Sequence, residues 1–152
     1  MLAGLLARHR KTRGVLYDLP EVVVGAEALN APDLAERCEI VGGDFFASVP
    51  SGGDAYILSR VIHDWDDTAA LKILSNCRRA MRSDGRLLLI EGVAKPPNEP
   101  DTNKFLDVWF IGGGGRERNE DEFRALLQAG GFRLLGVAHL DGRVSLLSSC
   151  PD

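Results

Sequence analysis

The stretch Ala55-Tyr56-Ile57-Leu58-Ser59-Arg60-Val61-Ile62-His63-Asp64-Trp65-Asp66-Asp67 decides the fold class and points to the chemistry. Its first four residues are a short apolar run that predicts a buried strand, and a helix is expected to begin near Thr68. In an open α/β sheet, ligands bind at the edge where the strands end, and His63 falls at that edge. An imidazole there titrates near neutral pH and can take a proton from a substrate.

Strands and helices alternate along the rest of the chain. We expect strands at 14–18, 38–42, 54–58, 86–91, 132–138 and 143–149. We expect helices at 1–9, 21–29, 67–82, 104–111 and 119–128. Asp141-Gly142 joins the last two strands and is a hairpin signal. The pattern predicts one α/β domain with a doubly wound sheet that closes on an antiparallel hairpin.

Composition narrows the classes of function. The 152 residues are enough for one domain, and a net charge of -4 gives no electrostatic support for binding nucleic acid. No apolar run approaches the length of a membrane span. The three cysteines are scattered, so they predict neither a zinc site nor a disulfide framework, and we expect a reducing cytoplasm. A small neutral or cationic partner suits such a chain best.

Two acids follow the first two predicted strands. Asp18 ends one strand, where a carboxylate can accept hydrogen bonds from a ribose hydroxyl pair. Asp44 follows two glycines after the next strand, and it could accept from an exocyclic amine while Phe45 packs against a ring. The alternatives are a helix cap at Asp18, a turn aspartate at Asp44 and a core phenylalanine. Two acids on successive strand tips favour a nucleoside site.

The residues around His63 also have two interpretations each. A lone histidine is more often structural and bonded to backbone, and Asp64 could orient it or cap the next helix. Trp65 could be core or could flank an aromatic ring. Glu91 ends the most apolar strand, where a carboxylate needs a donor that a histidine can supply. Glu117 lies between two arginines and by default belongs to a solvated charge cluster.

Six blocks of sequence come in one order: Gly14-Val15-Leu16-Tyr17-Asp18-Leu19-Pro20, Gly43-Asp44-Phe45-Phe46, His63-Asp64-Trp65-Asp66-Asp67, Leu89-Ile90-Glu91, Gly114-Gly115-Arg116-Glu117-Arg118 and Ala129-Gly130-Gly131-Phe132. This order resembles the catalytic domain of the S-adenosylmethionine-dependent O-methyltransferases, of the plant caffeate and flavonoid type and its actinobacterial polyketide-tailoring relatives. The similarity runs from about Leu2 to near the C-terminus. It implies a Rossmann-like methyltransferase sheet, the methyl donor S-adenosylmethionine and a small-molecule hydroxyl acceptor, with no role for nucleic acid or membrane.

The resemblance implies residues for the methyl donor. Asp18 would bind the ribose, and Asp44 and Phe45 would hold the adenine. Ser59 occupies the position where plant members carry a lysine near the adenine, so it is a further candidate for donor binding.

The resemblance also implies residues for catalysis and for the acceptor. His63 would be the general base that deprotonates the acceptor hydroxyl, and Glu91 and Glu117 would flank its ring. Trp65 and Asp107 would lie at the substrate pocket. Such a mechanism requires no metal, and we expect none.

The sequence departs from the family at its N-terminus. The family places a strand and a glycine-rich loop before the helix that begins here at Leu2, and an N-terminal domain through which full-length members form homodimers. We therefore expect a partial catalytic domain at 1–152 that lacks the first strand, the glycine-rich loop and the dimerisation domain. The alternatives to an active O-methyltransferase are a non-catalytic remnant of one and a family member with altered chemistry.

Overall fold

The computed structural model describes residues 1–29, 31–95, 98–99, 114–140 and 144–152. The chain forms two compact units, Met1–Pro50 and Ser51–Asp152. The expected mixed α/β class is confirmed, and the described strands form two sheets. The helix predicted at 104–111 and the turn at Asp141-Gly142 lie outside the described residues. The interpretation of 1–152 as one partial domain stays a prediction.

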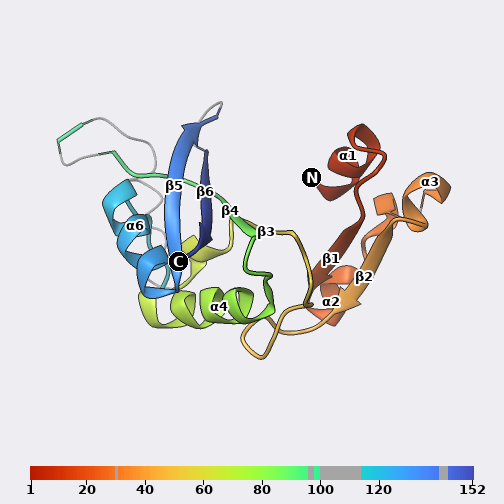
Figure 1. The fold of residues 1–152 in the computed structure, drawn as a ribbon, viewed down its shortest axis with the longest axis horizontal. Coiled ribbons are helices and arrows are strands. Elements are labelled where there is room, and N and C mark those ends of the chain that lie inside the picture. Colours follow the sequence, from red (N-terminus) through yellow and green to blue (C-terminus); the bar gives the residue numbers. More distant parts are fainter. Residues whose placement is uncertain (30, 96–97, 100–113, 141–143) are drawn as a thin grey trace. The chain divides into compact units, whose positions relative to one another are not determined.

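The first unit is a two-stranded parallel sheet with short helices. Its elements are α1 (Leu2–Arg8), β1 (Gly14–Asp18), α2 (Pro20–Val23), the 3-10 helix η1 (Glu27–Leu29), α3 (Pro32–Ala35) and β2 (Cys38–Gly42). Strands β1 and β2 lie side by side (Figure 1). Their pairing runs from Gly14 opposite Cys38 to Asp18 opposite Gly42. Because the strands are parallel, both carboxyl ends lie at the same edge.

The helix predicted at 21–29 is wrong in its second half. The first turn forms, and Pro20 occupies its first helical position, where its missing N–H and fixed φ are tolerated. The α-helix ends at Val23, and a separate 3-10 turn covers Glu27–Leu29. A run of β-branched valines at 22–24 followed by Gly25 has low helix propensity, so nothing local carries the helix further.

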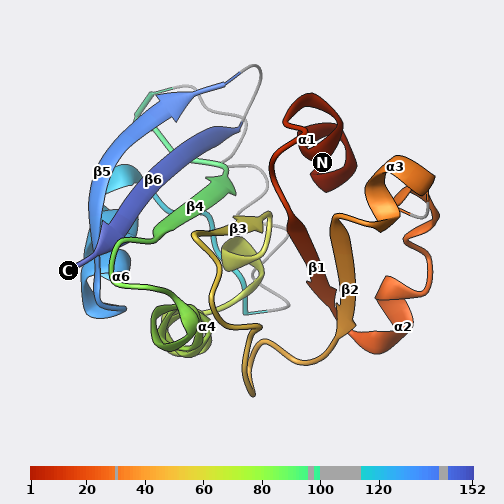
Figure 2. The same cartoon turned by 45° about the vertical axis from the view of Figure 1, so that its right-hand side comes forward.

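The second unit holds a mixed four-stranded sheet. Its elements are β3 (Ala55–Ser59), the 3-10 turn η2 (Ile62–Asp64), α4 (Asp67–Ala80), β4 (Arg86–Glu91), α6 (Glu120–Ala129), β5 (Phe132–His139) and β6 (Ser145–Pro151). The strand order is β3-β4-β6-β5, and β6 runs antiparallel to both of its neighbours. Figure 2 shows β4, β6 and β5 side by side. The predicted antiparallel end of the chain is therefore confirmed.

Two capped helices cover this sheet. Asp66 caps α4 by accepting a hydrogen bond from the N–H of Ala69, and Asn119 and Glu122 form a reciprocal capping box on α6. Helix α6 packs against β5 and α4. The fully buried apolar side chains include Ile73, Leu74, Leu87, Leu89, Phe123, Leu127, Phe132 and Leu147. Burying each one contributes about 1.5–3 kcal/mol, so this core fixes the edge at which β3 and β4 end.

The chain turns sharply where β3 ends. Ser59 pairs with Ile90, and Arg60 then takes a φ of 55°, in the left-handed region that is unfavourable for a residue with a Cβ. The N–H of Arg60 donates to Ile90 O at 2.9 Å, which holds this conformation. The turn η2 follows directly, so it lies at the carboxyl end of β4. A parallel bridge between Val93 and Arg118 brings the segment before α6 to the same end of the sheet.

Candidate active site

His63 and Glu91 form the centre of the candidate site. His63 Nδ1 lies 2.7 Å from Glu91 Oε2, and both side chains are buried. The other carboxylate oxygen, Oε1, accepts from the N–H of Val61 at 2.9 Å and from the N–H of Ile62 at 2.7 Å. Glu91 therefore finds three donors inside the core, which offsets the cost of burying a carboxylate.

This arrangement decides the tautomer and raises the basicity of His63. A carboxylate can only accept, so Nδ1 carries the proton and Nε2 carries the lone pair. The hydrogen bond that His63 donates to Glu91 raises the pKa of His63 above its usual value, burial of the ring opposes this, and Asp64 adds to the rise. Nε2 lies 3.2 Å from Asp64 Oδ1, whose side chain is half exposed. A protonated ring thus has a carboxylate on each nitrogen.

Glu117 is buried, so it is not part of a solvated charge cluster. A Cβ built on Gly92 would lie 2.7 Å from Glu117 Oε2, so the carboxylate packs directly on that glycine. Gly92 follows Glu91, and the structure therefore brings Glu117 to the end of β4 with His63 and Glu91. Its role as the second carboxylate that flanks His63 stays a prediction.

Arg118 is a site residue that sequence reasoning missed. Its side chain is 1% exposed, although an arginine in the charged run Arg116-Glu117-Arg118 is expected at the surface. Its guanidinium donates to Ile62 O at 3.1 Å and to Trp65 O at 2.9 Å, on either side of His63. No pattern in the sequence separates Arg118 from Arg116, because the difference lies in which of them faces η2.

The remaining residues expected around His63 have mixed outcomes. Trp65 is half-buried, and its backbone carbonyl accepts a hydrogen bond from Arg118. Ser59 is exposed at the end of β3, opposite Ile90. Asp107 lies outside the described residues. The roles of Trp65 and Asp107 at an acceptor and of Ser59 at the methyl donor stay predictions.

In the first unit, the structure brings Asp18 and Asp44 to one edge. Asp18 pairs with Gly42 across the sheet, and Asp44 follows two residues later. Asp18 Oδ1 accepts from the N–H of Leu19 at 2.8 Å, and Asp44 Oδ1 accepts from the N–H of Phe46 at 2.7 Å. The turn aspartate foreseen at Asp44 is therefore present. One oxygen of each carboxylate makes these local contacts. The roles of Asp18, Asp44 and Phe45 at the methyl donor stay predictions.

Aromatic side chains stiffen this edge. The hydroxyl of Tyr17 donates to Ser48 O at 2.7 Å, and burial raises the pKa of Tyr17, with Asp44 adding to the rise. A Cβ on Gly43 would overlap the Tyr17 ring, so only glycine permits this close approach. The rings of Phe45 and Phe46 meet edge to face at 4.9 Å. These contacts fix the loop that carries Asp44.

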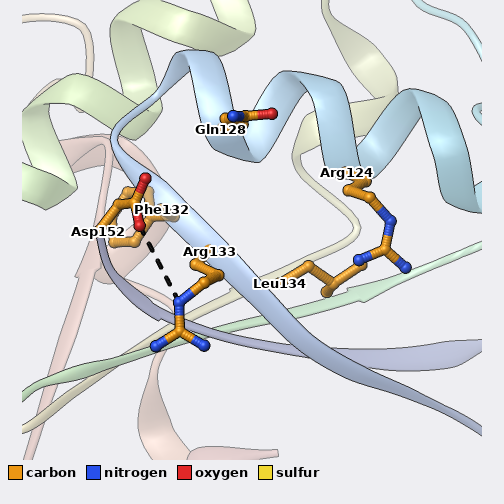
Figure 3. A pocket seen from close by; sticks show the side chains of 6 residues that line it. All are labelled: Arg124, Gln128, Phe132, Arg133, Leu134 and Asp152. Carbon is orange, nitrogen blue, oxygen red and sulfur yellow. Dashed lines mark ion pairs between the residues drawn. The ribbon is translucent and has the colours of Figure 1, made fainter.

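One surface pocket lies between α6 and β5 (Figure 3). Its lining residues are Arg124, Gln128, Phe132, Arg133, Leu134 and Asp152. Arg133 Nε and Asp152 Oδ1 lie 4.0 Å apart at its rim. None of the expected site residues lines it. Within the described residues there is no cluster of three or more histidine, cysteine or acidic side chains that could hold a metal, and no helix long and apolar enough to cross a membrane.

The comparisons with known proteins identify the family. The model of the O-methyltransferase domain matches residues 2–133. The chain therefore belongs to the O-methyltransferase domain family, as the six sequence blocks predicted. The structure of the mitomycin 7-O-methyltransferase MmcR superimposes with a TM-score of 0.92 at 35% identity, covering 99% of this chain and 45% of that one, in agreement with the expected methyltransferase fold.

Several curated relatives match nearly the whole chain. The phenazine O-methyltransferase PhzM of Lysobacter antibioticus is 41% identical over 153 residues, covering 99% of this chain and 45% of the relative. The 3-amino-4-hydroxybenzoate 4-O-methyltransferase of Streptomyces cremeus is 38% identical, with 98% and 42% covered. The phenazine-1-carboxylate N-methyltransferase of Pseudomonas aeruginosa is 37% identical, with 90% and 42% covered. The chain thus spans less than half the length of these relatives.

Solved structures show the same relationship. The crystal structure of LaPhzM superimposes with a TM-score of 0.92 at 41% identity, covering 99% of this chain and 46% of that one. NcsB1 from neocarzinostatin biosynthesis, solved with S-adenosyl-L-homocysteine and 1,4-dihydroxy-2-naphthoic acid, superimposes with a TM-score of 0.89 at 31% identity. The superposition covers 99% of this chain and 45% of the NcsB1 chain.

Proposed function

We propose that this protein transfers a methyl group from S-adenosylmethionine to a hydroxyl of a small aromatic or polyketide molecule. The observation that carries the proposal is the buried pair of His63 Nδ1 and Glu91 Oε2 at 2.7 Å. Because this pair occupies Nδ1, the lone pair of Nε2 is left to act as the base. A phenol with a pKa of about 10 is mostly protonated at neutral pH, so its methylation requires a base.

The edge formed by β1 and β2 fits the nucleoside half of the methyl donor. Asp18 and Asp44 lie at neighbouring strand ends, and Gly42 and Gly43 keep bulk away from the same edge. Asp18 would accept from the ribose hydroxyls, and Asp44 from the adenine amine with Phe45 beside the base. S-adenosylmethionine, when bound, supplies a methyl group on a sulfonium centre.

The other steps belong to the residues of the second unit. His63 Nε2 takes the proton of the acceptor hydroxyl. Glu91 holds Nδ1–H and stabilises the positive charge that the ring then gains. Asp64, at 3.2 Å from Nε2, can accept a hydrogen bond from the protonated nitrogen and is exposed enough to exchange that proton with water.

A transfer assay tests the proposal. The protein is incubated with S-adenosylmethionine labelled at its methyl group and with a panel of hydroxylated naphthoic acids, phenazines and benzoates. We expect label to move to at least one hydroxyl, with release of S-adenosylhomocysteine, and none to move without acceptor. Binding of S-adenosylhomocysteine without transfer to any acceptor would favour altered chemistry, and loss of both would favour a non-catalytic remnant.

N-methylation is the second candidate, because one relative at 37% identity is an N-methyltransferase. An aromatic ring nitrogen offers a lone pair and has no proton to remove, so it does not require the base at His63. A His63→Ala variant that keeps its turnover on a ring-nitrogen acceptor but loses it on a hydroxyl would separate the two reactions.

Assembly and location are further parts of the proposal. The resemblance supports homodimers for full-length members of the family and a cytoplasmic location for this protein. Light scattering of the purified protein and fractionation of producing cells test these two points.

A further inference from the structure

Arg118 makes an unusual set of contacts for a buried arginine. Nη1 donates to Ile62 O at 3.1 Å and reaches Arg116 O at 3.5 Å, while Nη2 donates to Trp65 O at 2.9 Å. Nε and Nη2 also contact Asp67 Oδ1 at 3.0 and 2.7 Å. One guanidinium therefore binds the backbone immediately before and two residues after His63, together with the first turn of α4.

The turn that carries His63 has little internal support. It is a single 3-10 turn, and its own backbone bonds are long, at 3.2 Å from Asp64 N to Val61 O and 3.3 Å from Trp65 N to Ile62 O. Such short turns have poor hydrogen-bond geometry. The direction of the imidazole is therefore set by what binds the turn from outside.

Two buried side chains of opposite charge bind this turn. Glu91 accepts from the N–H groups of Val61 and Ile62, and Arg118 donates to the carbonyls of Ile62 and Trp65. The N–H of Arg116 adds a bond of 2.8 Å to His63 O. Glu91 alone would hold only the start of the turn, at Val61 and Ile62. The end of the turn, at Trp65, therefore depends on Arg118.

The ion pair with Asp67 does not explain why Arg118 is buried. The Asp67 side chain is 58% exposed, and pairs with an exposed partner contribute little to stability. Burying a guanidinium is costly unless its donors are used, and here the backbone carbonyls use them. The planar fork of an arginine reaches acceptors in several directions at once, which the single ammonium of a lysine does not.

We infer that Arg118 is a positioning residue that holds His63 Nδ1 on Glu91 and so keeps Nε2 directed at the acceptor. The inference rests on the proposed function of His63 as a base. When Arg118 no longer donates to Ile62 O and Trp65 O, the hydrogen bond between His63 and Glu91 weakens, although neither of those two residues has changed.

The experiment uses Arg118→Lys, which keeps the charge and removes the fork. The pKa of the His63 ring is measured by NMR in the protein without acceptor, and kcat and KM for both substrates are measured across pH. We expect the His63 pKa to fall by about 0.5 or more, because its hydrogen bond to Glu91 weakens. We expect kcat to fall about tenfold or more and KM for S-adenosylmethionine to change less than about twofold, because only the base is misplaced.

Two further variants separate positioning from general stabilisation. Asp67→Asn removes the ion pair but leaves the carbonyl bonds, so it should change the melting temperature little and should change the His63 pKa much less than Arg118→Lys does. Arg124→Lys is the matched control, because Arg124 bonds Glu120 at 2.7 Å on the surface of α6. It should leave both the His63 pKa and kcat at their original values.

Clear outcomes would overturn the inference. A folded Arg118→Lys protein with an unchanged His63 pKa contradicts it, and so does an equal pKa fall in Asp67→Asn. If Arg118→Lys and the milder Arg118→Gln both fail to fold, Arg118 is a general structural residue and the inference is wrong. A pKa fall in a protein that methylates nothing would support the positioning role and refute only the proposed function.

Discussion

Glu91 holds both the imidazole of His63 and the turn that carries it. Its Oε2 lies 2.7 Å from His63 Nδ1, and its Oε1 accepts from the two backbone N–H groups that precede the histidine. One buried carboxylate therefore sets the tautomer, the orientation and the basicity of His63 together. Because the orientation exists before any ligand binds, the base requires no rearrangement at the moment of reaction.

Replacing His63 tests its role as the base. His63→Ala should lower kcat for a hydroxyl acceptor by roughly 10²–10⁴-fold, the usual contribution of a positioned base. Affinity for S-adenosylhomocysteine, measured by calorimetry, should change little. His139→Ala is the matched control, because His139 contacts the hydroxyl of Ser145 on the β5–β6 pair. Near-normal turnover in His63→Ala would contradict the assignment.

Replacing Glu91 tests the cause of the raised pKa of His63. In Glu91→Gln the pKa of His63 should fall, because the hydrogen bond to Glu91 is the largest cause of its rise and burial then dominates. Asp64→Asn should produce a smaller fall, because Asp64 contributes less. NMR titration of the His63 ring measures both. An equal fall of the His63 pKa in the two variants would show that the hydrogen bond from Nδ1 to Glu91 raises this pKa no more than the nearby charge of Asp64 does.

The same pKa predicts how stability depends on pH. The pKa of His63 is raised in the folded state above an unfolded value of about 6.5, so protonated His63 stabilises the fold. This contribution is complete below about pH 6.5 and is lost as the pH rises through the folded pKa. The melting temperature of the wild type should therefore exceed that of Glu91→Gln by more at low pH than at high pH. A constant difference across pH would contradict the linkage.

Replacing the two acids at the edge of β1 and β2 tests the nucleoside site. Asp18→Ala or Asp44→Ala should weaken binding of S-adenosylhomocysteine by about 1–3 kcal/mol, because donors on the ligand lose their acceptors. Glu39→Gln is the control, since Glu39 is an exposed carboxylate on β2 at the other end of the strand. A lower melting temperature with unchanged affinity in both alanine variants would assign these acids to structure alone.

Gly115 tests whether the backbone position of His63 matters. A Cβ at Gly115 would lie 2.4 Å from His63 O and 3.0 Å from Asp64 Cα, so Gly115→Ala must displace this backbone. A misplacement of about 1 Å can cost about 10²-fold in rate, and we expect a loss of kcat of that order. Gly136→Ala should be neutral, because a Cβ there meets nothing within 4 Å. Equal kcat in the two variants would show that the turn adapts freely.

Local signals predicted most of the elements. The apolar runs at 14–18, 38–42 and 86–91 form strands at those residues, and the helix expected at 119–128 forms as α6 with Asn119 as its cap. Period and capping are properties of neighbouring residues, so a single sequence contains them. The helix predicted at 21–29 was wrong in its second half because the valines at 22–24 and Gly25 have low helix propensity.

The sequence by itself determined the α/β class, the family and the candidates His63, Glu91, Asp18 and Asp44, because each of these follows from residue type and order along the chain. Only the tertiary structure decided which groups meet. It paired Nδ1 of His63 with Glu91, buried Glu117 against Gly92, and turned Arg118 inward while its neighbour Arg116 stayed half-buried. The physical reason is that charge, burial and hydrogen bonding depend on contacts between segments 25 or more residues apart, and no local pattern encodes those contacts.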